Sequence, residues 1–313
     1  MNNRTQNSIK QVVIWGHKLH THTHSYIHYG FYKAFNKLGY NTLWLDDSSD
    51  ISSLCFDDSL FITEGQVDNK IPILTNCYYI LHNCDLTKYK INDINVLILQ
   101  VYTKDCLKIN VKKIDKYIYY EEKTLENVYP ILYMPWATDL LPDEIDENIK
   151  NIDKNVLQNK TNKVNFVGML THEWISVKFF CAFNGLNFTS TGGYNDNIDS
   201  KINQKLIQES YISPSIQTKC QIDKGYIPCR IFKNISYGKM GITNNKTVAE
   251  LFNGNVIYNN DILKVLEMGM DFEKYENNKV KKARIINLMD YVKQKHTYLN
   301  RIKVILNCLN LPN

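Results

Sequence analysis

Short apolar runs alternate with amphipathic stretches in the first part of the chain. Residues 11–16 form an apolar run that ends in Gly16, and apolar positions at helical spacing follow over 26–38. Gly39, a residue typical of a helix C-terminus, precedes a second apolar run over 40–45. Further short runs rich in β-branched and aromatic residues lie at 59–63, 78–81, 96–100, 116–120 and 131–134. The pattern predicts a strand-helix-strand start and a mostly parallel sheet.

A second series of the same kind follows a charged stretch over 142–163 that lacks apolar periodicity. Residues 163–168 and 186–190 read as strands, and the helix predicted between them over 173–184 is followed by Gly185. Later segments predict helices over 203–209 and 230–237, strands over 211–213 and 241–243, and one or two amphipathic helices over 279–309.

These two series predict an α/β protein with two Rossmann-like, doubly wound domains that face each other across a cleft. The expected boundaries are an N-terminal domain over 1–140, a linker over 141–162, a second domain over 163–282, and C-terminal helices over 283–313. In such folds ligands bind at the carboxyl ends of the strands, so the loops after each strand are the places to look for function.

Composition narrows the function classes. The 37 Lys and Arg against 32 Asp and Glu give a net charge of +5, which is too mild and too evenly spread to favour nucleic acid as a partner. The eight cysteines contain no C-x-x-C motif, which argues against a zinc ribbon or a thioredoxin motif. No apolar stretch reaches the roughly 20 residues of a membrane span, and the polar start has no apolar leader, so we expect a cytoplasmic protein. The excess of Lys, Asn, Ile and Tyr is typical of an AT-rich genome, and a viral protein would act in the host cytoplasm.

Five of the eight histidines lie on one predicted loop, at positions 17, 20, 22, 24 and 28. If this loop is extended, His20, His22 and His24 share one face and could ligate a metal. A solvated polar loop is a second interpretation. The third is a phosphate site or a general base, with His17 at the end of the first strand and His24 near the start of the following helix.

Other strand ends add candidates for the same edge of the sheet. Glu64 follows a clear strand and could accept a proton from a substrate hydroxyl, although a solvated loop carboxylate is the simpler interpretation. His82 and Asn83 end the next apolar run. We therefore predict that the catalytic base is His24, His17 or Glu64. His22, His82 and Asn83 are predicted to contact the substrate.

Arg230 stands out because only four residues of the chain are arginines. Pro228 fits the first turn of a helix, which places Arg230 and Lys233 three residues apart near its start. An arginine fork, a lysine charge and the free N–H groups of a helix start together suit a diphosphate. The alternative is a helix whose cations face water.

Three segments carry a resemblance to a known family: 164–168, 225–238 and 241–245. They resemble the GT-B glycosyltransferases, and most nearly the bacterial and viral enzymes with a spore-coat-type (CgeB-like, glycosyltransferase family 1 type) carboxyl-terminal domain. The family pattern Arg-x-Phe-Glu, then a small residue, Gly and a short strand, aligns with Arg230-Ile-Phe-Lys233, Tyr237-Gly238 and residues 241–243.

The resemblance implies a hexosyltransferase-type enzyme (EC 2.4) that moves a sugar from a nucleotide-diphosphate donor, such as a UDP or GDP sugar, to an acceptor hydroxyl. It implies that the first domain holds the acceptor, that the second domain holds the nucleotide sugar, and that the C-terminal helices pack back towards the first domain. His22, His82 and Asn83 would then bind the acceptor. The resemblance also implies metal-independent transfer without a cofactor, and leaves both inversion and retention open. Arg230 and Lys233 would bind the donor diphosphate, with Gly168 allowing close approach of the backbone. Predicted nucleotide- and sugar-binding residues are Gly192, Gly193, Ser213, Tyr226, Thr243, Asn244, Asn245 and Glu250.

One departure from the family pattern matters. Where the family has a Glu that holds the ribose hydroxyls, this chain has Lys233, which cannot accept those hydrogen bonds. Glu250 could take over that role, the donor could differ, or catalysis could be lost. Two other functions stay open. The histidine loop suggests a metal-dependent hydrolase or epimerase centred on His20, His22 and His24, and Lys233 suggests a non-catalytic nucleotide- or sugar-binding protein on the same fold.

Overall fold

The computed structural model of the chain describes residues 9–19, 24–89, 95–102, 110–114, 117–123, 128–158, 161–168, 170–191 and 199–311. The chain forms two compact units. The first comprises Met1–Pro135 together with Tyr298–Asn313, and the second comprises Trp136–Thr297. Both mix helices and strands, so the predicted α/β class is confirmed. The arrangement of two domains across a cleft stays a prediction.

The first unit is built on an eight-stranded sheet in the order β2-β1-β3-β4-β5-β8-β7-β6. The six strands from β2 to β8 in this order pair in parallel, whereas β7 pairs antiparallel with both β8 and β6. The predicted mostly parallel sheet is therefore confirmed. The strand bounds are β1 Gln11–Trp15, β2 Thr42–Leu45, β3 Ser59–Glu64, β4 Tyr78–His82, β5 Asn95–Gln100, β6 Asn110–Ile114, β7 Tyr117–Lys123 and β8 Val128–Tyr133.

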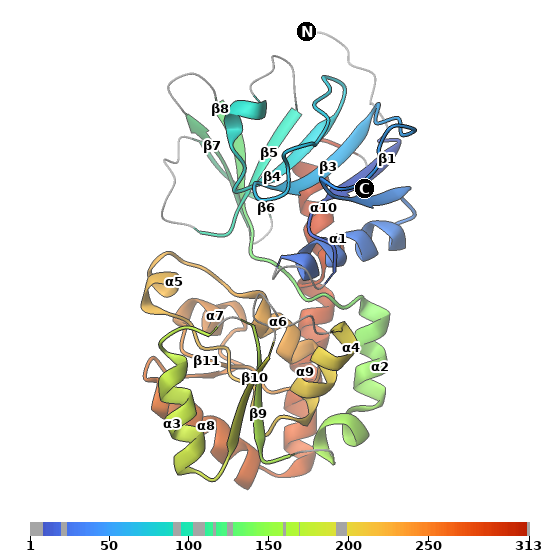
Figure 1. Cartoon of the computed structure of the whole chain (residues 1–313). Helices are drawn as coiled ribbons and strands as arrows, with labels where there is room; N and C mark the ends of the chain where they lie inside the picture. Colours follow the sequence, from blue (N-terminus) through green and yellow to red (C-terminus); the bar gives the residue numbers. More distant parts are fainter. Residues whose placement is uncertain are drawn as a thin grey trace. The chain divides into compact units, whose positions relative to one another are not determined.

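Alternation along the central strands explains how this sheet is covered on both faces. Val13, Trp15 and Phe61 belong to one apolar cluster on one side. On the other side, helix α1 (Ser25–Lys37) lies beside helix α10 (Tyr298–Cys308) (Figure 1). A glycine in α1 makes their contact close, because a Cβ at Gly30 would lie 2.3 Å from the Tyr298 ring. A short 3-10 helix, η1 (Leu86–Tyr89), follows β4.

The second unit packs helices around two short parallel pairs, β9 (Lys163–Val167) with β10 (Asn187–Thr191) and β11 (Ile242–Thr243) with β12 (Ile257–Tyr258). The apolar side chains of its helices and strands meet in one continuous core. The helices are α2 Pro142–Lys150, the π-helix η2 Asp153–Leu157, α3 Trp174–Phe183, α4 Ser200–Glu209, α5 Lys219–Asp223, α6 Cys229–Ser236, α7 Lys246–Leu251, α8 Ile262–Tyr275 and α9 Asn278–Lys295.

Two sequence expectations about this unit are wrong. Residues 141–162, expected to be a linker, contain α2 and η2, and Ile145, Ile152 and Val156 are buried in the core. Because the stretch is rich in charged residues, its few apolar positions do not show the spacing that predicts an amphipathic helix. Residues 211–213, expected to be a strand, form none; Tyr211 N–H donates a single hydrogen bond to the carbonyl of Lys163.

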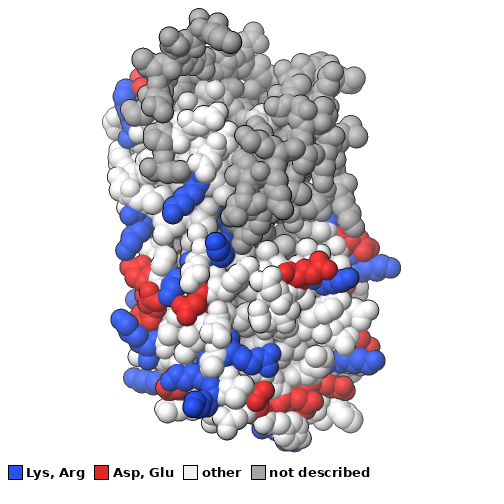
Figure 2. All heavy atoms as spheres, turned by 180° about the vertical axis from the view of Figure 1, so that it is seen from behind, with Lys and Arg blue, Asp and Glu red and all other residues white. Residues whose placement is uncertain are grey.

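The predicted C-terminal helices divide at Thr297. Helix α9 packs within the second unit against α6 and α2, while α10 belongs to the first unit. None of the described helices is long and apolar enough to cross a membrane. On the face seen in Figure 2, cationic and anionic side chains lie interspersed. A charged ligand on this face would therefore be recognised by individual side chains and not by a broad field of one sign.

Candidate functional site

Three of the predicted residues meet at the carboxyl end of β3 in the first unit. Glu64 is the last residue of β3, His17 lies just after β1, and His24 lies just before α1. Glu64 Oε1 is 2.7 Å from His17 Nε2, and Glu64 Oε2 hydrogen-bonds His24 Nδ1. The carboxylate side chain is only 3% exposed, against 14% for His17 and 25% for His24. The structure thus brings together a buried carboxylate and two more accessible imidazoles.

The charge state of Glu64 follows from these contacts. Burial alone would raise the pKa of Glu64, but the hydrogen bonds from His17 and His24 outweigh it and hold the pKa well below its usual range. Glu64 is therefore an anion at neutral pH and accepts hydrogen bonds. An imidazole that donates Nδ1–H to a carboxylate presents its Nε2 lone pair as the base, which suits His24 for taking a proton from a hydroxyl.

His28 lies behind this pair. Its ring stacks on that of His17 with centroids 5.9 Å apart, and it is only 4% exposed. Gly16 makes room for it, because a Cβ there would lie 2.4 Å from His28 Nδ1. Burial lowers the pKa of His28 to about 3, so its ring is neutral at physiological pH.

The predicted acceptor residues His82 and Asn83 lie at the end of β4, the strand that pairs with β3. The rings of His24 and His82 meet edge to face with centroids 5.7 Å apart. Asn83 Nδ2 is 3.0 Å from His82 Nε2, and Asn83 has a positive φ of 52°. Gly65 permits this turn to approach, since a Cβ there would lie 2.1 Å from the Asn83 carbonyl oxygen.

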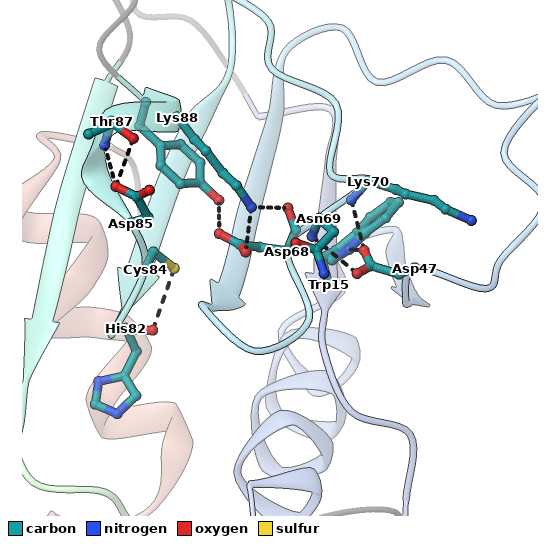
Figure 3. A network of polar contacts seen from close by, with 11 residues as sticks. Trp15, Asp47, Asp68, Asn69, Lys70, His82, Cys84, Asp85, Thr87 and Lys88 are labelled. Carbon is teal, nitrogen blue, oxygen red and sulfur yellow. Dashed lines mark hydrogen bonds and ion pairs between the residues drawn. The ribbon is translucent and has the colours of Figure 1, made fainter.

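Polar contacts hold together the loops that follow β2, β3 and β4 (Figure 3). The Asp47 carboxylate accepts hydrogen bonds from Trp15 Nε1 and from the backbone N–H groups of Asn69 and Lys70. The buried Asp68 binds Lys88 Nζ at 2.9 Å and the Tyr89 hydroxyl at 2.9 Å. These hydrogen bonds hold in place the loops at the edge of the sheet that carries Glu64 and His82.

A second group of candidates surrounds Arg230 near the start of α6 in the second unit. Its guanidinium carbon lies 4.2 Å from the centre of the Phe166 ring and 5.7 Å from that of Trp174. Gly168 has a φ of +134°, and a Cβ there would lie 2.9 Å from Arg230 Nη2. Arg230 Nε is buried without a hydrogen-bond partner, and no described residue forms an ion pair with this side chain.

This environment suits an anion. Burial lowers the pKa of Arg230, but an arginine keeps its charge at neutral pH. Aromatic faces stabilise the cation without using its N–H donors. A guanidinium without a carboxylate partner thus retains its donor fork for a phosphate.

Lys233, the predicted second diphosphate ligand, lies against a carboxylate of its own unit. Its Nζ is 3.6 Å from Asp139 Oδ2, and the same carboxylate accepts hydrogen bonds from the Tyr237 hydroxyl at 2.8 and 2.9 Å. Asp139 is 5% exposed. This pairing joins residues 94 positions apart and had no signal in the sequence. It partly neutralises the positive charge of Lys233 within the protein.

Most of the predicted nucleotide- and sugar-binding side chains bond within the protein. Asn244 exchanges two hydrogen bonds with the backbone of Gln217, while Asn245 caps α7 and donates to the Gln217 side chain. Thr243 Oγ1 accepts a hydrogen bond from the backbone N–H of Asn245, and Ser213 Oγ donates one to the Ile207 carbonyl. The Tyr226 carbonyl accepts hydrogen bonds from the side chains of Gln217 and Asn245. These groups brace the segment before α6.

Glu250, the residue named above as an alternative for holding ribose hydroxyls, lies exposed on the surface of the second unit. It is 64% exposed on α7, and its Oε1 lies 3.7 Å from Lys246 Nζ one turn earlier. His20, His22, Gly192 and Gly193 lie outside the described residues. Within the described ranges, no group of three or more His, Cys, Asp or Glu side chains is arranged to hold a metal ion.

No protein-family model and no curated protein sequence matches the chain. Solved structures do match it in fold. The N-terminal domain of trehalose-6-phosphate phosphatase from Candida albicans is 7% identical with a TM-score of 0.52, and the match covers 99% of this chain and 98% of that one. An alpha,alpha-trehalose-phosphate synthase (UDP-forming) from Burkholderia xenovorans, in complex with glucose-6-phosphate, is 9% identical with a TM-score of 0.51, and the match covers 90% and 78%.

At such low identities these likenesses show the fold alone. The likeness to the synthase fits the predicted GT-B fold class, whereas the CgeB-like subtype stays a prediction. A phosphatase domain and a synthase share this fold, so function has to be argued from the site residues themselves.

Proposed function

We propose that the chain is a glycosyltransferase of the GT-B type that moves a sugar from a nucleotide-diphosphate donor to an acceptor hydroxyl. The observation that carries the proposal is the Arg230 guanidinium, stacked on Phe166 and Trp174 beside Gly168 without an ion-pair partner among the described residues. The UDP-forming synthase among the fold neighbours supports the same class of donor. UDP and GDP sugars are the donors to test first.

Arg230 would stabilise the negative charge that develops on the departing nucleoside diphosphate. In a site of low dielectric, a fixed cation of this kind contributes several kcal/mol to a transition state. Gly168 would let backbone approach the phosphates, and Lys233 would add a weaker charge because Asp139 already lies against it. Gly192 and Gly193 remain proposed lining residues. The transfer would need no metal ion and no cofactor.

The base would come from the cluster around Glu64. His24 is the most exposed of the three grouped residues, and its Nδ1 bond to the Glu64 carboxylate would stabilise the imidazolium that forms when Nε2 takes the hydroxyl proton. His17 is the second candidate for this role. His82 and Asn83, with His22, are the proposed acceptor-binding residues. A positioned base contributes about 10²–10⁴-fold to a rate.

A thermal-shift screen against UDP, GDP, dTDP, CMP and ADP, with and without EDTA, tests the donor site. A ligand that binds only the native state at about 100 times its Kd stabilises the protein by about 2.7 kcal/mol. We expect a shift with one nucleoside diphosphate, insensitive to EDTA and lost in Arg230→Ala.

Arg284→Ala is the matched control variant, because Arg284 also stacks on a phenylalanine, Phe272, at 5.0 Å but pairs with Glu276 at 3.9 Å. An equal shift in wild type and Arg230→Ala would contradict the donor assignment. Destabilisation by EDTA without any nucleotide effect would favour the metal-dependent hydrolase or epimerase.

A non-catalytic nucleotide-binding protein is the second candidate. The observation that favours it is Lys233, which stands where the resembling family has an acceptor carboxylate and is held by Asp139. This function predicts the same Arg230-dependent binding without release of nucleoside diphosphate from any nucleotide sugar. A turnover assay therefore separates the two candidates.

A further inference from the structure

Glu173 is a carboxylate that none of the preceding roles uses. It directly precedes α3, in the connection that leaves β9 and begins with Gly168. Its side chain is 11% exposed. Oε1 lies 3.0 Å from His172 Nε2, on a ring that is 82% exposed, whereas Oε2 is buried without a hydrogen-bond partner.

Three other carboxylates of the second unit have partners or face solvent. Asp139 is held by Tyr237 and Lys233. Glu273 lies 3.8 Å from Lys281 Nζ, and Glu250 is 64% exposed. Among the described residues of the chain, Glu173 is the carboxylate with a buried oxygen that lacks a partner.

A buried carboxylate oxygen without a hydrogen-bond partner destabilises the folded protein, so its retention calls for a ligand. Arg230 presents the complementary feature nearby, a buried N–H without an acceptor. The backbone that carries Glu173 lies near Arg230. The centre of the ring of Trp174, the next residue, is 5.7 Å from the Arg230 guanidinium carbon. Yet Glu173 and Arg230 do not form an ion pair with each other.

A ligand that carries phosphate oxygens and hydroxyl groups a few atoms apart would satisfy both side chains. The phosphates accept hydrogen bonds from arginine, and the hydroxyls donate to the carboxylate. A nucleoside diphosphate has this combination in its ribose, and a nucleotide sugar has it on both sides of the diphosphate.

We propose that Glu173 accepts a hydrogen bond from a sugar hydroxyl of the nucleotide ligand whose phosphates bind Arg230; the assignment rests on the proposed function. Glu173 then performs the acceptor role for which Lys233 lacks lone pairs and which the exposed Glu250 does not fill. The hydroxyl belongs to the ribose or to the transferred sugar, and both have the same chemistry towards a carboxylate.

Calorimetric titration of the full chain separates these sources. The probes are UDP, GDP and ADP, their 2′,3′-dideoxy counterparts, UDP-glucose and GDP-mannose. Wild type, Glu173→Gln, Glu173→Ala, Arg230→Ala and the control Glu147→Gln, at a carboxylate that is 66% exposed on α2, are compared. The Tm of each variant is measured alone to confirm folding.

For a ribose hydroxyl, wild type binds the ribonucleotide ~10-fold or more tightly than the dideoxy form, and both Glu173 variants lose most of this ratio. For a hydroxyl of the transferred sugar, the dideoxy ratio stays unchanged while the variants lose ~10-fold or more in affinity for the nucleotide sugar relative to the nucleoside diphosphate. Glu147→Gln behaves as wild type in either case.

Unchanged ratios in folded Glu173 variants, with binding that still depends on Arg230, overturn the assignment of Glu173 alone. Failure of wild type to bind any probe overturns the proposed function and the Glu173 assignment with it. The two failures are therefore distinct.

Discussion

The buried His28 makes the stability of the first unit depend on pH. Its ring is 4% exposed, and burial lowers its pKa to about 3 from an ordinary 6.5, with Glu64 opposing the shift and His24 and His17 adding to it. The folded protein therefore holds a neutral imidazole at a pH where the unfolded chain binds a proton. As pH falls below 6.5, protonation stabilises the unfolded state, and the free energy of unfolding decreases until the folded ring also titrates near pH 3.

The magnitude follows from the two pKa values. At pH 5 an unfolded imidazole is protonated about 30 times more often than it is neutral, which lowers the free energy of unfolding by about 2 kcal/mol. Above about pH 7.5 the contribution vanishes. The titration of Glu64 adds little to the change between pH 7.5 and pH 5. A carboxyl whose pKa is lowered in the folded state stabilises the protein above its ordinary pKa of 4.5, and this stabilisation is lost only as pH falls below that value.

The assay is urea denaturation of wild type and His28→Phe at pH 7.5 and pH 5, followed by tryptophan fluorescence, to which Trp15 and Trp44 of the first unit contribute. Phenylalanine keeps a ring next to Gly16 and His17 but cannot take a proton. The loss of unfolding free energy between the two pH values should be smaller in the variant by about 2 kcal/mol. Because other groups titrate in both proteins, an equal loss in the two would refute the assignment of a buried, neutral His28.

Three further substitutions follow from the same contacts. Glu64→Gln removes the charge that stabilises an imidazolium, so turnover should fall by about 10²–10⁴-fold with little change in nucleotide affinity; a kinetic and calorimetric comparison checks this, and full activity would exclude the base assignment. Gly30→Ala drives a Cβ into the Tyr298 ring and should lower the unfolding free energy by about 1–3 kcal/mol in urea denaturation, whereas a neutral result would mean that α1 and α10 separate easily. Gly168→Ala meets a backbone φ of +134° and Arg230 Nη2, so it should lower Tm and weaken nucleotide binding together; wild-type affinity would argue against an approach of backbone to the phosphates.

Much of the first unit was predictable because its signals are local. Buried parallel strands are short, continuous apolar runs, and the carboxyl ends of neighbouring strands meet at one edge of a sheet. This is why Glu64 could be placed at the same edge of the sheet as the loop of His17 and His24, which precede it by 47 and 40 residues.

Features that depend on packing between distant segments could not be predicted from the sequence. Helix α2 was missed because only a few of its side chains are apolar and buried. The pairing of Lys233 with Asp139 and the stacking of Arg230 on Phe166 join segments with no local pattern in common. Asn245 was predicted to bind the nucleotide or sugar from the family resemblance alone; its cap on α7 and its hydrogen bond to Gln217 had no signal in the sequence.

Release of nucleoside diphosphate from UDP and GDP sugars tests the central claim most directly. The full-length chain is incubated with each sugar donor and a mixture of hydroxyl acceptors, and wild type is compared with Arg230→Ala and Arg284→Ala. The proposed glycosyltransferase predicts acceptor-dependent release by wild type and Arg284→Ala, insensitive to EDTA, and a large loss in Arg230→Ala. Release that is equal in wild type and a folded Arg230→Ala protein would contradict a donor diphosphate site at this arginine.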